Sequence, residues 1–163
     1  MVKNHYPILF SKKSDGQYLQ RALDVANVSY ECTQYIVDVL GVKDVGARYP
    51  GKLTYHPCCH LLRELHVDEQ PRALLAQLRE AEIVDLPDAE ACCGFGGLFA
   101  LKNAEISTAI GRRKVRNIEA SGADVAVVND VSCLTHLNGI LKREGKTQRA
   151  KHIVEVLNDR GDE

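Results

Sequence analysis

The sequence predicts an α/β domain with an open, mainly parallel sheet flanked by helices and with cysteines at the carboxyl edge of the strands. Two observations predict this fold class. Short apolar runs alternate with longer segments of helical periodicity, which favours parallel strands joined by right-handed crossovers. Cysteines also follow three of the predicted strands, and the carboxyl ends of parallel strands lie along one edge of a sheet. We therefore expect cysteines that are distant in sequence to meet there.

Length, charge and cysteine content narrow the class of protein. The 163 residues fit a single domain over 1–163, in which a helical segment over 1–50 is expected to pack on the remainder. The balance of 21 basic and 22 acidic side chains gives no field that would attract nucleic acid or an anionic membrane. No apolar run has the length of a signal peptide or of a transmembrane segment, so we expect a cytoplasmic protein. In that reducing compartment six cysteines favour metal ligation, catalysis or burial over disulfides.

The first predicted element is a helix over residues 17–40, where apolar side chains recur every three or four positions. Ser14 or Asp15 is expected to cap its start, and Gly41 to end it. Cys32 lies in the middle of this segment and is interpreted as a core residue.

Three strands are predicted over residues 52–56, 81–86 and 124–129. The third has the clearest signal, because a short β-branched run suits a sheet that is covered on both faces. The predicted helices after the first strand cover residues 60–66, a segment with Pro71 in its first turn, residues 104–120 between Asn103 and Gly122, a segment from Cys133 to Gly145, and residues 151–157.

Five of the cysteines are predicted to lie at the same kind of position in the fold, just after the end of a strand. Cys58 and Cys59 follow the first strand, Cys92 and Cys93 follow the second after a short loop, and Cys133 follows the third. Cys59 and Cys133 each open a predicted helix, whose free N–H groups stabilise a thiolate. Because metals bind thiolates, this pattern indicates a metal centre.

A glycine-rich turn adjoins the vicinal cysteine pair. Gly94, Gly96 and Gly97 let the main chain approach a bulky inorganic group, and their amides are suited to donate hydrogen bonds to sulfide. We therefore interpret them as cofactor-binding residues.

Three other interpretations of the cysteines remain open at this point. A zinc site usually contains Cys-x-x-Cys pairs, and so does a thiol oxidoreductase, but the sequence contains no such pair. A cysteine nucleophile would require one lone cysteine near a histidine such as His56 or His60. The clustering of several cysteines disfavours that third interpretation.

The spacing of the cysteines resembles a known family. Cys59 and Cys92 are separated by 32 residues, and 39 residues lie between Cys93 of the Cys92-Cys93-Gly94 motif and Cys133. This pattern resembles the cysteine-rich CCG domain of the heterodisulfide reductase B subunit, of the iron–sulfur subunits of glycolate oxidase and anaerobic glycerol-3-phosphate dehydrogenase, and of lactate utilization protein A. The stretches 55–63, 92–97 and 129–134 are most similar to the second CCG domain of the lactate utilization protein A group.

The resemblance implies an iron–sulfur electron-transfer component of an oxidoreductase that acts on lactate or a related 2-hydroxy acid. It implies a 4Fe-4S cluster, cubane or non-cubane, whose ligands are Cys59, Cys92, Cys93 and Cys133. It assigns no catalytic residue. The alternative function is a redox-inactive or zinc-holding interaction domain with the same fold.

A fifth ligand is less clearly marked. The heterodisulfide reductase pattern ends in Cys-x-x-Cys, whereas this sequence has His136 three residues after Cys133. His136 and Cys58 are the two further candidate ligands, and Cys58 stands where members of the lactate utilization group tend to have serine. The resemblance is therefore compatible with a four-cysteine cluster, a labile cluster, or an empty site in aerobically prepared protein.

The resemblance also implies partners. The lactate utilization relatives carry two CCG domains, and this sequence matches the later one. We expect other subunits of an oxidoreductase complex, with a flavin or quinone on another chain, or a second CCG domain. An apolar face that lacks its partner would also favour a homodimer.

Several polar residues receive simpler interpretations. His56 and His60 are expected to orient the ligands by hydrogen bonding, and Asp130 is expected to cap a helix. Isolated basic residues on helices are expected to be solvated, and this group comprises Arg63, Lys102, Arg112 and Arg113.

Overall fold

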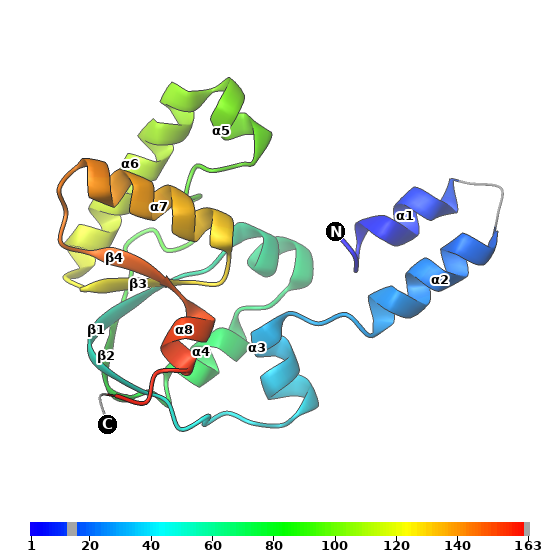
Figure 1. The fold of residues 1–163 in the computed structure, drawn as a ribbon, viewed down its shortest axis with the longest axis horizontal. Helices are drawn as coiled ribbons and strands as arrows, with labels where there is room; N and C mark the ends of the chain where they lie inside the picture. The colour runs from blue at the N-terminus through cyan, green and yellow to red at the C-terminus, as the bar shows by residue number, and fades with distance from the viewer. Residues whose placement is uncertain (13–15, 162–163) are drawn as a thin grey trace.

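The computed structural model describes residues 1–12 and 16–161. Four strands form one sheet in the order β2-β1-β3-β4, and every neighbouring pair is parallel (Figure 1). Their bounds are β1 Arg48–His56, β2 Arg79–Val84, β3 Val125–Val128 and β4 Arg149–His152. The helices are α1 His5–Ser11, α2 Gly16–Asn27, α3 Cys32–Gln34, α4 Glu69–Leu75, α5 Leu98–Lys102, α6 Ala104–Ser121, α7 Val131–Arg143 and α8 Ile153–Leu157, with the π-helices η1 Tyr35–Val39 and η2 Leu61–Leu65.

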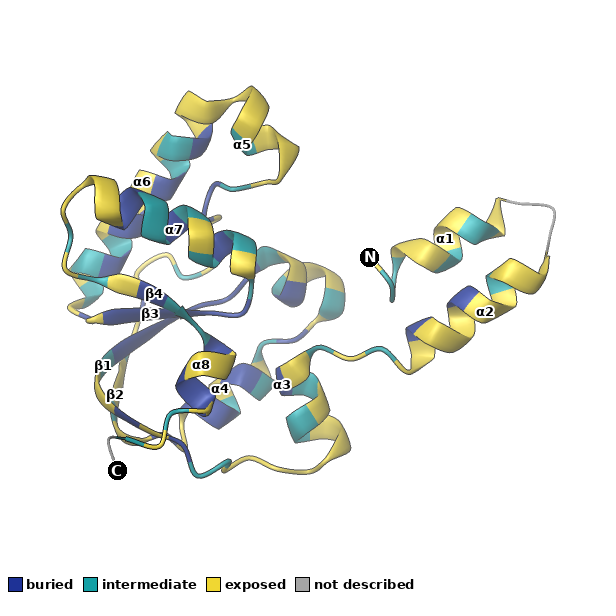
Figure 2. Cartoon of the chain, viewed as in Figure 1, coloured by how far each residue is buried: buried dark blue, intermediate teal, exposed yellow. Residues whose placement is uncertain are grey.

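The core has two halves, one on each face of the sheet. Ala126 and Val128 of β3 belong to the cluster that includes side chains of α6 and α7. Val125 and Val127 alternate with them and belong to the cluster on the opposite face, with side chains of α4 and α8. All four residues of β3 are buried, which Figure 2 shows as dark blue. The predicted open parallel α/β sheet is therefore confirmed.

The fourth strand lies outside the sequence prediction. Residues 149–152 pair with β3 in parallel, so the helix predicted to start at residue 151 starts instead at Ile153. The sequence of this strand has no run of apolar residues, and only Ala150 of it is buried. Such a strand is held by main-chain hydrogen bonds at a sheet edge, which its side chains do not reveal.

The predicted single helix over residues 17–40 is wrong. Helix α2 ends at Asn27 and α3 begins at Cys32. The break has a local cause, because the Glu31 carboxylate accepts hydrogen bonds from the backbone N–H groups of Thr33 and Gln34 and so caps a new helix. Gly41 follows η1 with a φ of +69°, as predicted for a helix end. The expected caps Ser14 and Asp15 lie outside the described residues.

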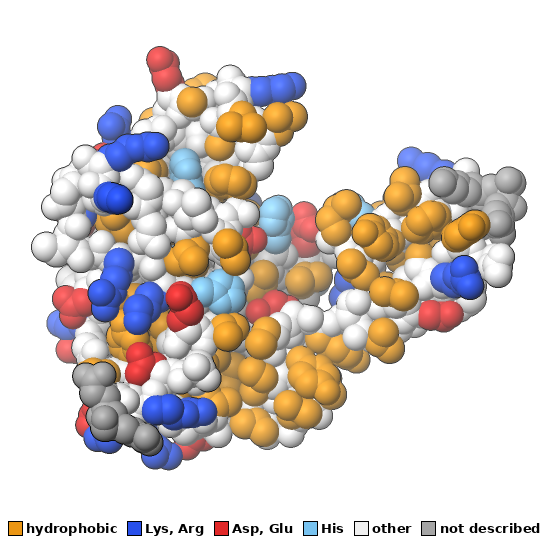
Figure 3. Space-filling model, in the orientation of Figure 1, with side chains coloured by type: hydrophobic (Ala, Val, Ile, Leu, Met, Phe, Trp, Pro, Cys, Tyr) orange, Lys and Arg blue, Asp and Glu red, His pale blue; other side chains and the backbone are white. Residues whose placement is uncertain are grey.

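Within the N-terminal segment, α3 and η1 lie beside α4, whereas the α1–α2 hairpin extends away from the sheet (Figure 1). The amide of Asn4 donates a hydrogen bond of 2.8 Å to the Glu64 carbonyl, which ties the start of the hairpin to η2. In α1 and α2 only Ala22 and Ala26 are buried. Apolar side chains therefore remain on the surface of this hairpin, and Figure 3 shows them in orange.

Cys32 is exposed at the start of α3, so its interpretation as a core residue is wrong. The prediction rested on the general tendency of free cysteines to be buried and on a position in the middle of one long helix, whereas Cys32 begins a new short helix.

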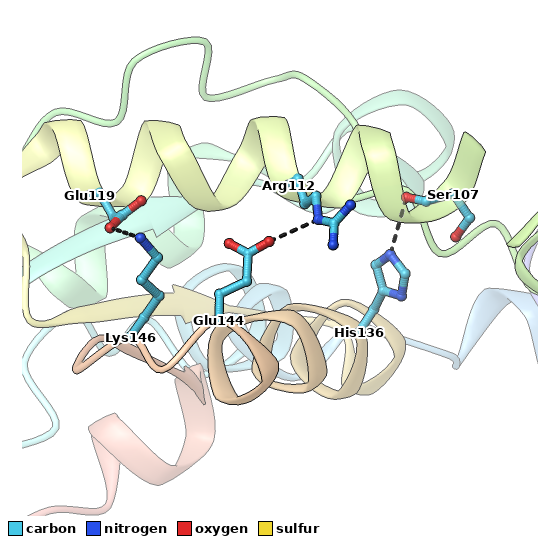
Figure 4. A network of polar contacts seen from close by, with 6 residues as sticks. All are labelled: Ser107, Arg112, Glu119, His136, Glu144 and Lys146. Carbon is cyan, nitrogen blue, oxygen red and sulfur yellow. Dashed lines mark hydrogen bonds and ion pairs between the residues drawn. The ribbon is translucent and has the colours of Figure 1, made fainter. Parts of the chain in front are cut away.

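Polar contacts join α6 to α7 and to the turn that follows it (Figure 4). Arg112 Nε lies 2.8 Å from Glu144 Oε1, and Lys146 Nζ lies 2.7 Å from Glu119 Oε1. Most of these side chains are in contact with water, so each pair adds little to stability. The pairs nevertheless align two helices that both border the cysteine cluster.

Among the described residues, no helix combines the length and the apolar character needed to cross a membrane.

Candidate metal centre

The carboxyl edge of the sheet holds a cavity of about 180 Å³. Cysteines from three separate segments line it. The lining consists of Cys58, Cys59, His60, Cys92, Cys93, Phe95, Gly96, Gly97, Asp130, Ser132 and Cys133.

Cys133 is fixed by the first turn of α7. The Asp130 side chain accepts hydrogen bonds from the N–H groups of Ser132, at 2.7 Å, and of Cys133, at 3.1 Å. Asp130 is therefore the N-cap of α7, as predicted. The cap orients the first turn so that Cys133 is buried at the inner wall of the cavity.

Cys58 and Cys59 occupy different depths. Cys58 is 1% exposed and belongs to the core cluster beneath the cavity, whereas Cys59 is partly exposed. The pKa of Cys59 is raised to about 11, mainly by burial and in part by the neighbouring thiols of Cys58 and Cys92. A free Cys59 is therefore a thiol at neutral pH.

Cys92 and Cys93 also lie at different depths. Cys93 is buried, and Cys92 is exposed at the mouth of the cavity. The N–H of Gly94 donates to Cys92 Sγ at 3.2 Å. This amide is the kind of donor that stabilises a thiolate or a bound cluster.

The buried thiols of Cys93 and Cys133 form a hydrogen-bonded pair. Cys93 Sγ and Cys133 Sγ lie 3.0 Å apart. Contact with Cys133 lowers the pKa of Cys93 most strongly, burial opposes this change, and His56 adds to the lowering. Hydrogen bonds to Cys58 and Cys93 and burial raise the pKa of Cys133. The contact between the two side chains thus favours the thiolate form at Cys93 and the thiol form at Cys133.

The three predicted cofactor-binding glycines have different surroundings. Gly96 and Gly97 line the cavity. Gly94 is buried against α6, where a Cβ atom would collide with the Ser107 carbonyl and would lie 2.9 Å from the backbone nitrogen of Gly111. Ser107 Oγ in turn donates a 2.7 Å hydrogen bond to the Gly94 carbonyl. Gly94 therefore seats the cysteine loop on α6, and Gly96 and Gly97 face the cavity.

Sequence reasoning missed Lys114, a buried lysine of α6. Its Nζ donates to the carbonyl oxygens of Asp88, at 2.7 Å, and Ala89, at 2.9 Å, in the loop that leads to Cys92 and Cys93. Burial lowers the pKa of Lys114 to about 8, and the charges of Asp88, Cys93 and Cys92 oppose this change. The available signal was its position on the apolar stripe of α6, four residues before Ile118.

His136, a candidate fifth ligand, lies on α7 against α6. Its Nε2 is 3.4 Å from the Ser107 carbonyl (Figure 4). Its ring meets Phe95 edge-on at a centroid distance of 6.0 Å. Among the described residues, the lining of the cavity does not include His136.

A family model described as the CCG cysteine-rich domain matches residues 53–138, which include all five cysteines of the cavity. The chain belongs to the CCG family. The match also covers the end of β1 and all of β2 and β3, the strands that deliver the thiols in this CCG domain.

Curated relatives agree with this assignment. The CCG domain is 44% identical over 153 residues to lactate utilization protein A of Oceanobacillus iheyensis and 47% identical over 155 residues to that of Anoxybacillus flavithermus. It is 43% identical over 157 residues to the Bacillus cereus protein of the same name. These alignments cover 94%, 95% and 96% of this chain but 62%, 64% and 65% of the relatives. The chain therefore spans less than two thirds of the length of these relatives.

The donor set fits a metal cluster. Thiolates are the usual protein ligands of iron–sulfur clusters, and five thiols of this CCG domain meet at one cavity. His56, Cys93 and Cys133 also place their ligand atoms within 4.8 Å of one another. The site is thus able to bind a metal cluster.

Proposed function

We propose that this chain is the iron–sulfur electron-transfer component of an oxidoreductase that acts on lactate or a related 2-hydroxy acid. In this proposal Cys59, Cys92, Cys93 and Cys133 hold a 4Fe-4S cluster. Such a cluster would accept and pass on electrons.

The observation that carries the proposal is the convergence of the cysteines on a single cavity of about 180 Å³. Cys59 and Cys92 contribute accessible thiols at its mouth, and Cys93 and Cys133 contribute buried thiols at its inner wall. Phe95 adds an apolar side chain to the lining, beside the polar side chains of His60, Asp130 and Ser132. Gly96 and Gly97 allow the backbone to approach a bulky group at the mouth.

The relatives supply the proposed substrate. All three carry the name lactate utilization protein A, and the similarity extends over nearly the whole chain described here. Because the chain spans less than two thirds of these proteins, their activity is assigned to it here as a proposal.

The test is anaerobic reconstitution of the purified chain with ferrous iron and sulfide. The expected result is broad visible absorption, an electron paramagnetic resonance signal on reduction, and about four iron and four sulfide per chain. The Cys92→Ser and Cys93→Ser variants should lose these signals. Cys32→Ser is the matched control, because Cys32 is exposed and lies outside the cavity. Colourless wild-type protein after reconstitution would refute the proposal.

The proposed partners are other subunits of an oxidoreductase complex or a second CCG domain, with a homodimer as the alternative. Exposed apolar side chains on the α1–α2 hairpin support a partner, since Ile8 is 56% and Val28 is 74% exposed. Light scattering across a range of concentrations distinguishes a monomer from a homodimer. We place the protein in the cytoplasm, where six free thiols would persist.

The alternative function is a redox-inactive or zinc-holding interaction domain. The compact group of His56, Cys93 and Cys133 favours it, because nitrogen and sulfur ligands at this spacing suit a single metal ion. Uptake of zinc alone, with no iron–sulfur chromophore under any reducing condition, would support this alternative.

A further inference from the structure

A second cavity, of about 350 Å³, lies between α6 and the loop after β2. Cys92 lines both this cavity and the cysteine cavity, so the two adjoin at its thiol. The volume is near the lower end of the about 300–1,000 Å³ that is typical of small-molecule sites. The α6 side chains that matter for its chemistry are Ile106, Ile110, Arg113, Lys114 and Arg116.

Ile106 and Ile110 form the apolar part of this cavity. They are four positions apart on α6, so their side chains lie on one face of the helix, one above the other. Ile106 is 56% exposed and Ile110 is partly exposed, whereas Val115 and Ile118 of the same helix are completely buried. The two isoleucines thus present an apolar surface that a ligand would remove from water.

Cationic side chains line the other end of the cavity. Arg113 is paired with the Asp88 carboxylate, and Lys114 donates hydrogen bonds to carbonyl oxygens of the loop. In the part of the chain that the structure describes, the exposed Arg116 makes no ion pair or hydrogen bond. Because Asp88 offsets one of three cations, positive charge predominates at this end. A free guanidinium is suited to bind a carboxylate through two parallel hydrogen bonds.

The distance between the apolar and the cationic end limits the shape of the ligand. Ile106 and Arg116 are ten positions apart on α6, which corresponds to about 15 Å along the helix axis. Helical side chains lean toward the N-terminus, which brings the Arg116 guanidinium closer to the isoleucines. A ligand that contacts both ends therefore needs a hydrocarbon chain between its carboxylate and its apolar end. A three-carbon acid is too short for this.

We propose that this cavity binds a monocarboxylate with an apolar chain of about six to ten carbon atoms, a length that suits the span along α6. Arg116 holds the carboxylate, and the chain lies along Ile110 and Ile106. A ligand in this position covers the exposed thiol of Cys92. The site goes beyond the proposed iron–sulfur function and does not depend on it, since its carboxylate-binding and apolar groups belong to α6 and hold no cluster.

The test is calorimetric titration of the reduced, metal-free chain with the sodium salts of straight-chain monocarboxylates from acetate to decanoate. We expect one octanoate per chain and an affinity that rises about two- to fourfold with each added methylene group. Octanamide has the same chain without the charge. It should bind about tenfold more weakly, because a hydrogen bond between two charged groups is stronger than one to a neutral group.

Arg116→Gln should weaken octanoate binding about tenfold and leave octanamide binding unchanged. A general loss of structure would instead weaken both. Arg143→Gln is the matched control, because Arg143 is an exposed arginine at the end of α7 and does not line the cavity. It should bind octanoate as the wild type does. Ile106→Ser should weaken the binding of octanoate and octanamide alike, with folding verified by circular dichroism.

The thiol of Cys92 provides a second measurement. Iodoacetate carries a carboxylate and iodoacetamide is neutral, so the ratio of their alkylation rates reports the local positive charge. This ratio should be higher at Cys92 than at Cys32, which is exposed next to Glu31, and should fall in Arg116→Gln. Octanoate should slow the alkylation of Cys92 by iodoacetamide but not that of Cys32. Peptide mass mapping assigns the modified residue.

The outcomes separate this site from the proposed function. Equal affinity for octanoate and octanamide would overturn the site, and so would octanoate binding that Arg116→Gln leaves unchanged. Octanoate binding that does not protect Cys92 would place the ligand elsewhere and would also overturn it. Because every measurement uses metal-free protein, failure to bind octanoate would leave the cluster proposal standing. Failure of iron–sulfur reconstitution would likewise leave the carboxylate site standing.

Discussion

The Sγ atoms of Cys93 and Cys133 lie 3.0 Å apart, although 40 positions separate the two residues in the sequence. Cys93 belongs to the loop after β2, and Cys133 belongs to the first turn of α7, which follows β3. The two strands are not adjacent, because β1 lies between them. The short distance therefore results from the loop after β2, which crosses the end of β1 to reach α7.

The proximity of these thiols predicts an intramolecular disulfide in the metal-free protein. A disulfide needs a sulfur–sulfur distance of about 2.0 Å, so only a small movement is required. Treatment with diamide should remove two free thiols per chain, and peptide mass mapping should identify the Cys93–Cys133 link. The oxidised protein should fail to bind metal until it is reduced. A link between Cys92 and Cys32 instead would contradict the described geometry.

Substitution of Gly94 by alanine should destabilise the fold. Gly94 has a φ of +95°, and an added Cβ would collide with the Ser107 carbonyl of α6. We expect a loss of about 2–5 kcal/mol from backbone strain and overpacking, measured by urea unfolding. Gly122→Ala is the matched control, because Gly122 is in the left-handed helical region, with a φ of +69°, and has open space around its Cα. The control should lose only about 1 kcal/mol.

Removal of the cap of α7 should disturb Cys133. Asp130→Ala deletes the acceptor of two backbone N–H groups, which should cost about 1 kcal/mol of unfolding free energy. Because Cys133 is in that first turn, its alkylation rate in the metal-free protein should also rise. Asp130→Asn keeps an oxygen acceptor and should retain most of the stability. Equal loss in both variants would indicate that the charge of Asp130 matters more than the cap.

The buried amine of Lys114 predicts a pH dependence of stability. Burial lowers its pKa to about 8 from 10.5, so between these values the unfolded chain binds more protons than the folded chain. Stability from this group therefore rises with pH across that window, by about 1–2 kcal/mol after allowance for screening. Urea unfolding at pH 7.5 and pH 10 should show a relative gain for wild type over Lys114→Met. An equal response of both proteins to pH would refute the assignment. The comparison with the variant removes the opposing contribution of Cys59, whose raised pKa lowers stability as pH rises from 9 to about 11.

Much of the fold follows from patterns visible in the sequence. The run of valines and alanine in β3 is buried on both faces, and this pattern alone identifies a central strand. Helix α6 begins and ends within one residue of the prediction, because Asn103 and Gly122 mark its ends. Strand β4 was missed because its main chain, and not its side chains, holds it in the sheet. The break before α3 was missed because a single glutamate cap interrupts an otherwise continuous apolar period.

The sequence predicted the edge of the sheet at which the cysteines lie, but not how deeply each cysteine is buried. Cys59, Cys92 and Cys133 each follow a parallel strand, and the carboxyl ends of these strands share one edge. The sequence shows this placement of the cysteines after the strands. Which member of a vicinal pair points inward depends on the path of the loop. The burial of Cys58 and the exposure of Cys92 therefore could not be predicted from the sequence. Lys114 was missed for a different reason, since a lysine on an apolar stripe is normally a solvated residue at the edge of that stripe.

One carbonyl oxygen, that of Ala89, is held by both the Lys114 ammonium and the His56 ring. These two side chains belong to α6 and β1, so the loop is tied to two separate elements of the fold. The loop that carries Cys92 and Cys93 is thus anchored by hydrogen bonds from the polypeptide itself. Loading and emptying of the centre would then leave the polypeptide folded, in contrast to small zinc fingers that unravel when their ion is removed.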